Sequence, residues 1–114
     1  MNRISHMSAE RWQKLSFVEQ MANIGSEVYR SINWSRRKDD RFQAAFERAL
    51  ELFYLTADDK RWIGRYKEIT RSRDMFCTLL LNPENYKKPE DELDFLNRYF
   101  LEFAMCVRNR KDRK

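Results

Sequence analysis

Residues 16–32, SFVEQMANIGSEVYRSI, carry both the start signal and the core-facing pattern of a helix. Ser16 and Glu19 have the spacing of a capping box, in which each side chain accepts a hydrogen bond from the other residue's backbone amide. Apolar residues then recur at steps of three and four, which keeps one helix face turned inward. The stretch predicts an amphipathic helix over residues 16–33. Its apolar positions are Phe17, Met21, Ile24, Val28 and Ile32.

Gly25 lies in the middle of this predicted helix. Glycine in a helix interior costs about 1 kcal/mol relative to alanine, so its presence there needs a reason. The simplest reason is shape, because a second helix can approach the backbone closely where no side chain intervenes. The sequence therefore predicts a close helix crossing at Gly25.

Three further segments, 39–55, 57–81 and 89–108, repeat the helical spacing of apolar residues. Asp39-Asp40, Thr56 with Asp59, and Pro89 with the acids after it are typical of helix starts. The 57–81 segment has the seam Trp62, Tyr66, Ile69, Arg73, Phe76 and Leu80, and the 89–108 segment has Leu93, Leu96, Phe100, Phe103 and Val107.

Arg73 interrupts the apolar seam of the 57–81 segment. A buried arginine is costly unless it is paired. We expect an ion pair with a carboxylate of a neighbouring helix, or a position at the rim of the seam. The candidate partners are Glu27, Glu47 and Glu51.

The composition supports one all-α domain. Among 114 residues there are only two glycines and two prolines, too few for the turns of an all-β fold, while 42% hydrophobic and 36% charged residues supply a core and a charged exterior. Because short links make successive helices pack side by side, we expect an antiparallel up-down-up-down four-helix bundle over residues 16–108. Residues 1–15 are predicted to be a flexible leader and residues 109–114 a basic tail.

No catalytic, cofactor or metal motif is present. His6 is the only histidine, so a histidine base beside a Ser or Cys nucleophile has no candidate in the body of the chain. Phosphate-binding loops need several glycines, and a di-iron bundle needs a Glu-x-x-His motif that is absent. The acidic clusters stand at predicted helix starts, where capping explains them. We therefore predict a protein that is not an enzyme, with no cofactor and no metal.

Cys77 and Cys106 lie on the apolar sides of their predicted helices, without Cys-x-x-Cys or Cys/His spacing. We expect buried free thiols, which fit a reducing compartment. No run approaches the roughly 18 apolar residues of a membrane span. The prediction is a cytoplasmic protein that does not enter a membrane.

Basic residues cluster between residues 60 and 73, where six cations face one acid, and the whole chain carries a net charge of +5. On one continuous helix most of them would form a stripe opposite the apolar seam. Such a stripe suits a phosphate backbone without reading bases, although a solvated face is the alternative explanation. The predicted nucleic-acid contacts are Lys60, Arg61, Arg65, Lys67 and Arg71, together with Arg36, Arg37 and Lys38.

The end of the 39–55 segment is apolar nearly all round. Such a surplus often indicates a neighbour beyond the monomer. We expect a homo-oligomer whose interface includes Leu52 and Phe53, with Trp34.

A Trp12-Gln13-Lys14 element precedes the first long helix, and the seams are rich in aromatic residues. With the chain length, the basic balance and four amphipathic helices, the chain resembles small bacterial four-helix-bundle proteins related to the protein encoded in intervening sequences of 23S ribosomal RNA genes. That group also resembles the accessory variability protein of diversity-generating retroelements. The resemblance covers about residues 10–108. It implies a non-enzymatic, ring-like homo-oligomer, often a pentamer, that binds nucleic acid or a partner protein.

The function predicted from the sequence is a non-catalytic, oligomeric helical interaction module, as an accessory or scaffold protein. The alternative is sequence-nonspecific binding of RNA or DNA by the basic outer face of the 57–81 segment.

Overall fold

The computed structural model describes residues 8–112, and the side chains of residues 8–110. Every regular element in this range is helical, and no strand occurs in it. The elements in chain order are α1 (Ala9–Trp12), α2 (Phe17–Arg36), α3 (Phe42–Ala57), the 3₁₀ helix η2 (Lys60–Arg65), α4 (Tyr66–Leu81), the 3₁₀ turn η3 (Pro83–Asn85) and α5 (Pro89–Asp112).

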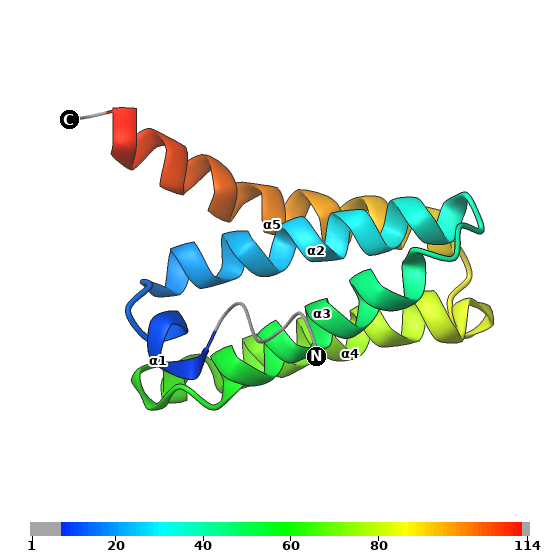
Figure 1. Ribbon diagram of the computed structural model, residues 1–114. Helices are drawn as coiled ribbons and strands as arrows, with labels where there is room; N and C mark the ends of the chain where they lie inside the picture. The colour runs from blue at the N-terminus through cyan, green and yellow to red at the C-terminus, as the bar shows by residue number, and fades with distance from the viewer. Residues whose placement is uncertain (1–7, 113–114) are drawn as a thin grey trace.

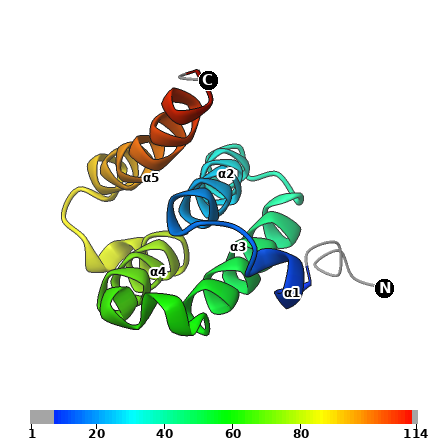
Figure 2. The ribbon, with the colours of Figure 1, turned by 90° about the vertical axis from the view of Figure 1, so that its left-hand side faces the viewer.

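The four long helices pack closely around one core. α2 makes its most extensive contacts with α3 on one side and α5 on the other, and α4 lies across the core from it (Figures 1 and 2). All five apolar positions predicted for α2 are at most 5% exposed. Leu93, Leu96 and Phe100 of α5 are also buried, whereas the later part of α5 diverges from α2 (Figure 1).

The two local predictions for α2 are confirmed. Ser16 Oγ accepts a hydrogen bond from the Glu19 amide, and Glu19 Oε1 accepts one from the Ser16 amide, so the capping box is formed. A Cβ atom placed on Gly25 would stand 2.7 Å from Cβ of Phe100. Because that separation is far below van der Waals contact, only glycine allows α2 and α5 to cross this closely.

The prediction of one helix over residues 57–81 is wrong. α3 continues to Ala57, η2 follows, and α4 begins at Tyr66. The chain bends at Trp62, whose φ of −106° and ψ of 26° are not helical. Thr56 is a buried residue within α3 and not a helix cap. The predicted cap of α3 is also wrong, because its N-cap residue is Arg41, without a side-chain cap.

The buried face of α4 differs from the predicted seam by about one residue. Ile69, Ser72, Phe76 and Leu79 face the core, while Tyr66 is half exposed. The Ser72 hydroxyl donates a hydrogen bond to the Ile69 carbonyl, so burying Ser72 costs far less free energy than burying an arginine. Arg73 lies at the rim and pairs with the adjacent Asp74, so none of its three predicted partners is correct.

Trp12 changes the boundary of the folded domain. Residues 8–15 belong to the predicted leader, yet Trp12 is fully buried and part of the core. With α1 and η2, it covers the apolar end of α3 that suggested a neighbouring subunit. The predicted tail is also too long, because α5 continues to Asp112. Residues 1–7, including His6, and residues 113–114 lie outside the described range.

Cys77 and Cys106 are half-buried and free rather than fully buried, and burial raises the pKa of the Cys77 thiol. None of the helices that the structure describes combines the length and the apolar run needed to cross a membrane.

The two glycines give a matched test of the α2–α5 contact. Gly25→Ala should lower the free energy of unfolding by about 1–3 kcal/mol, because the new methyl overlaps Phe100. Gly64→Ala has open space around the new Cβ and should raise it by about 0.4–1 kcal/mol, since alanine restricts the unfolded chain. Urea denaturation of both variants measures the two signs. Equal or greater stability of the Gly25→Ala variant would contradict the close crossing.

Candidate interaction surfaces

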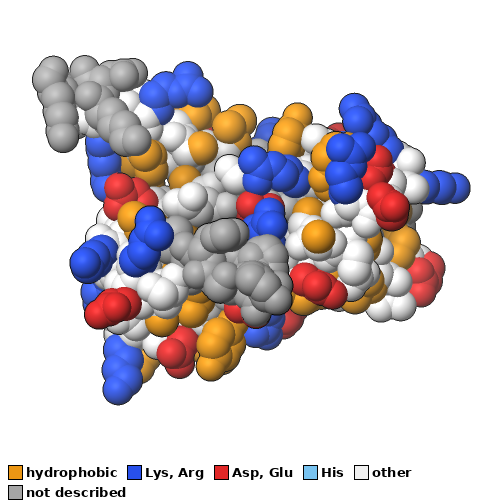
Figure 3. Space-filling view, in the orientation of Figure 1, with side chains coloured by type: hydrophobic (Ala, Val, Ile, Leu, Met, Phe, Trp, Pro, Cys, Tyr) orange, Lys and Arg blue, Asp and Glu red, His pale blue; other side chains and the backbone are white. Residues whose placement is uncertain are grey.

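The cations predicted to form one basic stripe are divided between two helical elements. Lys60, Arg61 and Arg65 lie in η2, whereas Lys67 and Arg71 lie in α4. Lys and Arg side chains are spread over the face seen in Figure 3, with Asp and Glu among them. The structure therefore brings these residues together in smaller groups than a continuous helix would.

Arg61 and Arg65 are engaged within the chain. Arg61 contacts Asp59 with Nη2 to Oδ2 at 2.7 Å and also donates to the Leu15 carbonyl. Arg65 pairs with Glu68 at 2.8 Å, and its guanidinium lies 4.1 Å from the centre of the Phe17 ring. These contacts within the chain account for the presence of both arginines without a phosphate ligand.

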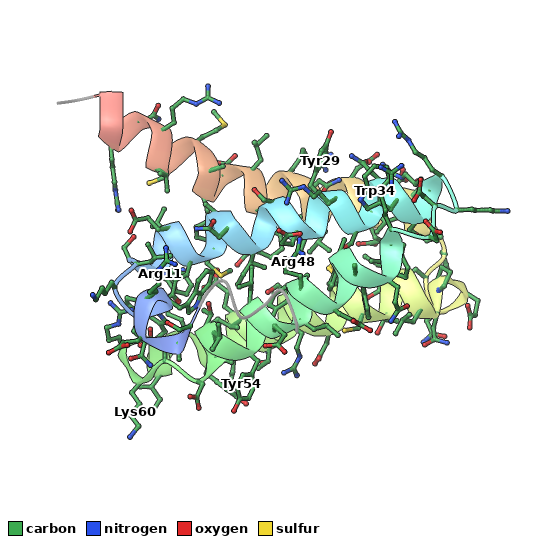
Figure 4. All side chains as sticks on the ribbon, in the orientation of Figure 1. Arg11, Tyr29, Trp34, Arg48, Tyr54 and Lys60 are labelled. Carbon is green, nitrogen blue, oxygen red and sulfur yellow. The ribbon has the colours of Figure 1, made fainter. Side chains whose placement is uncertain are left out.

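Lys60, Lys67 and Arg71 remain exposed, and within residues 8–110 none of them has an ion-pair partner. Lys60 projects away from the packed helices at the η2 end of the molecule (Figure 4). These three residues are the part of the predicted basic face whose charge is available to a ligand.

The second predicted basic group, at the end of α2, is engaged in three different ways. Arg36 pairs with Glu90 at 2.8 Å and with Asp94 at 3.1 Å, which joins α2 to α5. The guanidinium of Arg37 lies 5.5 Å from the centre of the Trp34 ring. Lys38 adopts a left-handed φ of 54°, and backbone bonds from Lys38 to Ser35 and from the next amide to Trp34 close the helix end.

The predicted oligomer interface is wrong for two of its three residues. Leu52 is 7% exposed and Phe53 is fully buried, so both belong to the core of the chain itself. Trp34 is half-buried at the surface of α2, where the Arg41 guanidinium lies 4.0 Å from its ring centre. Only Trp34 is therefore placed where another molecule can reach it.

A buried polar network joins α1, α2, α3 and η2 around the side chain of Gln20. The Gln20 amide nitrogen donates to the Trp12 carbonyl at 2.8 Å and to Asp59 Oδ2 at 3.2 Å. Gln20 Oε1 accepts from Thr56 Oγ1 and from Trp62 Nε1, each at 3.0 Å. Every hydrogen-bonding position of this buried amide is thus used, and sequence reasoning identified none of these contacts.

The same network holds an ionised carboxylate in place. Trp12 Nε1 donates to Thr56 Oγ1 at 2.9 Å, and Asp59, only 4% exposed, accepts from Arg61 and from Gln20. The hydrogen bonds from Arg61 lower the pKa of Asp59. Because its members bond to one another, we interpret this network as structural.

A second buried carboxylate belongs to Glu27, which is 8% exposed. It pairs with Arg30 at 2.9 Å and, more distantly, with Arg48 of α3 at 3.8 Å. Arg48 lies between α2 and α3 (Figure 4). This pairing joins the two helices, and it replaces the predicted pairing of Glu27 with Arg73.

A groove of about 280 Å³ lies on the surface between α4 and α5. Its apolar lining includes Met75, Leu96 and Tyr99, and Phe95 at its edge is 51% exposed. The Tyr99 hydroxyl donates to Glu68, and burial together with this bond raises the pKa of Tyr99. The polar rim carries both signs of charge, from Glu68 and Arg71.

A larger groove of about 420 Å³ lies between α2 and α5, beside the contact of Gly25 with Phe100. Tyr29 and Leu101, 56% and 53% exposed, form its apolar walls. Along α2 it continues into a hollow of about 320 Å³ that shares Tyr29 and Ser26 with it. The remaining residues of this hollow are Arg30, Asn33, Trp34 and Arg37.

The exposed apolar residues of α5 could have been noticed in the sequence. Phe95, Leu101 and Met105 fall outside the predicted seam, and each is about half exposed. Apolar side chains off the core-facing stripe are the only sequence signal for these grooves.

Within residues 8–110 no group of three or more His, Cys, Asp or Glu side chains is placed to hold a metal ion. Comparison with family models, curated proteins and solved structures finds no match to this chain.

Proposed function

We propose that this chain is a non-catalytic helical interaction module that self-associates, built as an antiparallel up-down-up-down four-helix bundle. The observation that carries the proposal is the α4–α5 groove. Phe95 protrudes beside an apolar hollow, and the rim holds one acid and one base. In a two-fold pair, Phe95 of each copy faces the hollow of the other, and the acid of each rim faces the base of the other, so the face is complementary to itself.

The energetics favour this contact. Burying the exposed half of a phenylalanine against apolar side chains contributes about 0.8–1.5 kcal/mol, and a same-face contact buries Phe95 from both copies. Glu68 is already bonded to Arg65 and Tyr99, so the rim is ordered before a second copy arrives. The preformed groove therefore reduces the entropy cost of association.

The compartment proposed for this module is the cytoplasm. Cys77 and Cys106 are free thiols on different helices, α4 and α5. Thiols of this kind persist in a reducing environment.

Molar mass from light scattering at micromolar concentration tests self-association. The wild-type chain should exceed the monomer mass of 14.0 kDa, and Phe95→Glu should return it to that value. Ile63→Glu is the matched control, because Ile63 is 79% exposed on η2, outside the groove. Twice the monomer mass fits the same-face pair, whereas a ring of five fits the resemblance. A monomeric wild type, or a Phe95→Glu variant that keeps the larger mass, would contradict the proposal.

Sequence-nonspecific nucleic-acid binding is the second candidate. The observation that favours it is the exposure of Lys60, Lys67 and Arg71 without ion pairs in the described part of the chain. Arg61 and Arg65 are left out of this set because reversing their charges would break contacts with Asp59 and Glu68.

Labelled RNA and duplex DNA in a salt titration test the second candidate. Affinity should fall steeply as salt rises, and reversing the charges of Lys60, Lys67 and Arg71 should flatten that slope by about three phosphate contacts. Reversal of Lys87 and Lys88, exposed between η3 and α5, is the control for a large change of net charge at another site. No binding at low salt would exclude this function.

A further inference from the structure

We infer that the α2–α5 groove is a docking site for an amphipathic helix of a partner protein, with carboxylates in its first turn over Arg37. This inference concerns a surface and a partner different from those of the proposed self-association, and it does not depend on that proposal.

The groove has the form that receives a helix. Its walls are the exposed side chains of Tyr29 on α2 and Leu101 on α5, and the later part of α5 diverges from α2 (Figure 1). Together with the adjoining hollow, it extends along α2 from Ala22 to Arg37. At 1.5 Å per residue this is about 22 Å, or about four helical turns. Helix-in-groove recognition uses apolar anchors at this spacing.

The charge of its lining residues distinguishes this groove from the α4–α5 groove. Among the side chains of residues 8–110, none that is acidic lines either of the two hollows along α2, whereas Arg30 and Arg37 line the second one. Arg30 already pairs with Glu27 at 2.9 Å. Arg36 and Arg41 nearby pair with Asp94 and Asp39. Arg37 and the adjacent Lys38 have no carboxylate partner within residues 8–110, so they leave a local positive charge for a ligand. A second copy of the same cationic rim would be repelled, which favours an acidic partner.

The aromatic residues define where the two parts of the partner would lie. Tyr29 stands between the apolar groove and the cationic hollow, and Trp34 lies further along α2 under Arg37 and Arg41 (Figure 4). An apolar anchor fits between Tyr29 and Leu101, and a carboxylate next to Trp34 can reach Arg37. This arrangement fixes a direction along the groove.

The direction follows from helix dipoles. Acidic residues stabilise the first turn of a helix, where the dipole is positive. Placing that turn over Arg37 puts it beside the C-terminal end of α2, whose dipole is negative. The docked helix therefore runs antiparallel to α2, with its apolar residues following toward Ala22 and Ala104.

A displayed library of random helical peptides of about 16 residues, selected on the full-length chain, tests the inference. The selected peptides should be enriched in Asp or Glu in the first turn and in apolar residues three and four positions apart after it. Absence of enrichment, or enrichment of basic peptides, would overturn the inference.

The selected peptide with the highest affinity, labelled with a fluorophore, then locates the site by anisotropy. Arg37→Glu and Leu101→Gln should each weaken its binding about 10-fold or more, while Lys67→Glu, the same charge change on α4, should not. Circular dichroism checks that helical content is unchanged. Equal affinity for the wild type and both groove variants would overturn the site.

Light scattering of the Leu101→Gln variant separates the two proposals. Loss of self-association in this variant would show that a second copy occupies the α2–α5 groove, and would overturn the partner helix. If the selection yields no peptide that binds the chain while Phe95→Glu still abolishes self-association, this inference is rejected and the proposed function is unaffected.

Discussion

The side-chain amide of Gln20 is the point on which the arrangement of one end of the molecule depends. A fully buried amide is tolerated only when its donors and acceptor find partners, and here those partners come from α1, α3 and η2. Because each partner lies on a different segment, satisfying one amide fixes three segments against α2. Trp12 is held in the core by this requirement as well as by its apolar surface.

The surfaces follow from these internal contacts. The bond from Trp62 to Gln20 accompanies a bend within η2. The chain then begins a new helix, α4, after Arg65, so the cations of residues 60–73 are divided between two elements. Arg61 is then used to neutralise Asp59. At the other side of α2, the contact of Gly25 with Phe100 brings α5 close and creates a groove beside it. Core packing thus decides which charges and which apolar residues remain available for partners.

The sequence predicts what local rules control. The capping box at Ser16, the buried face of α2 and the start of α5 at Pro89 depend on neighbouring residues, and all three are confirmed. Thr56 was misinterpreted as a cap because its hydroxyl is bonded by Trp12, a residue 44 positions away. Leu52 and Phe53 were misplaced at an interface for the same reason, since the residues that cover them are distant in sequence. The grooves were not predicted because each is formed by two helices whose relative position the sequence pattern does not specify.

Hydrogen exchange of the tryptophan indole protons, followed by NMR, tests the central role of the Gln20 network most directly. Trp12 Nε1–H is fully buried and bonded to Thr56, so it should exchange as slowly as the most protected backbone amides of α2. Trp34, half-buried at the surface, provides the internal reference and should exchange much faster. Exchange of the Trp12 proton as fast as that of Trp34 would show that α1 is not held by the network, and would contradict the account.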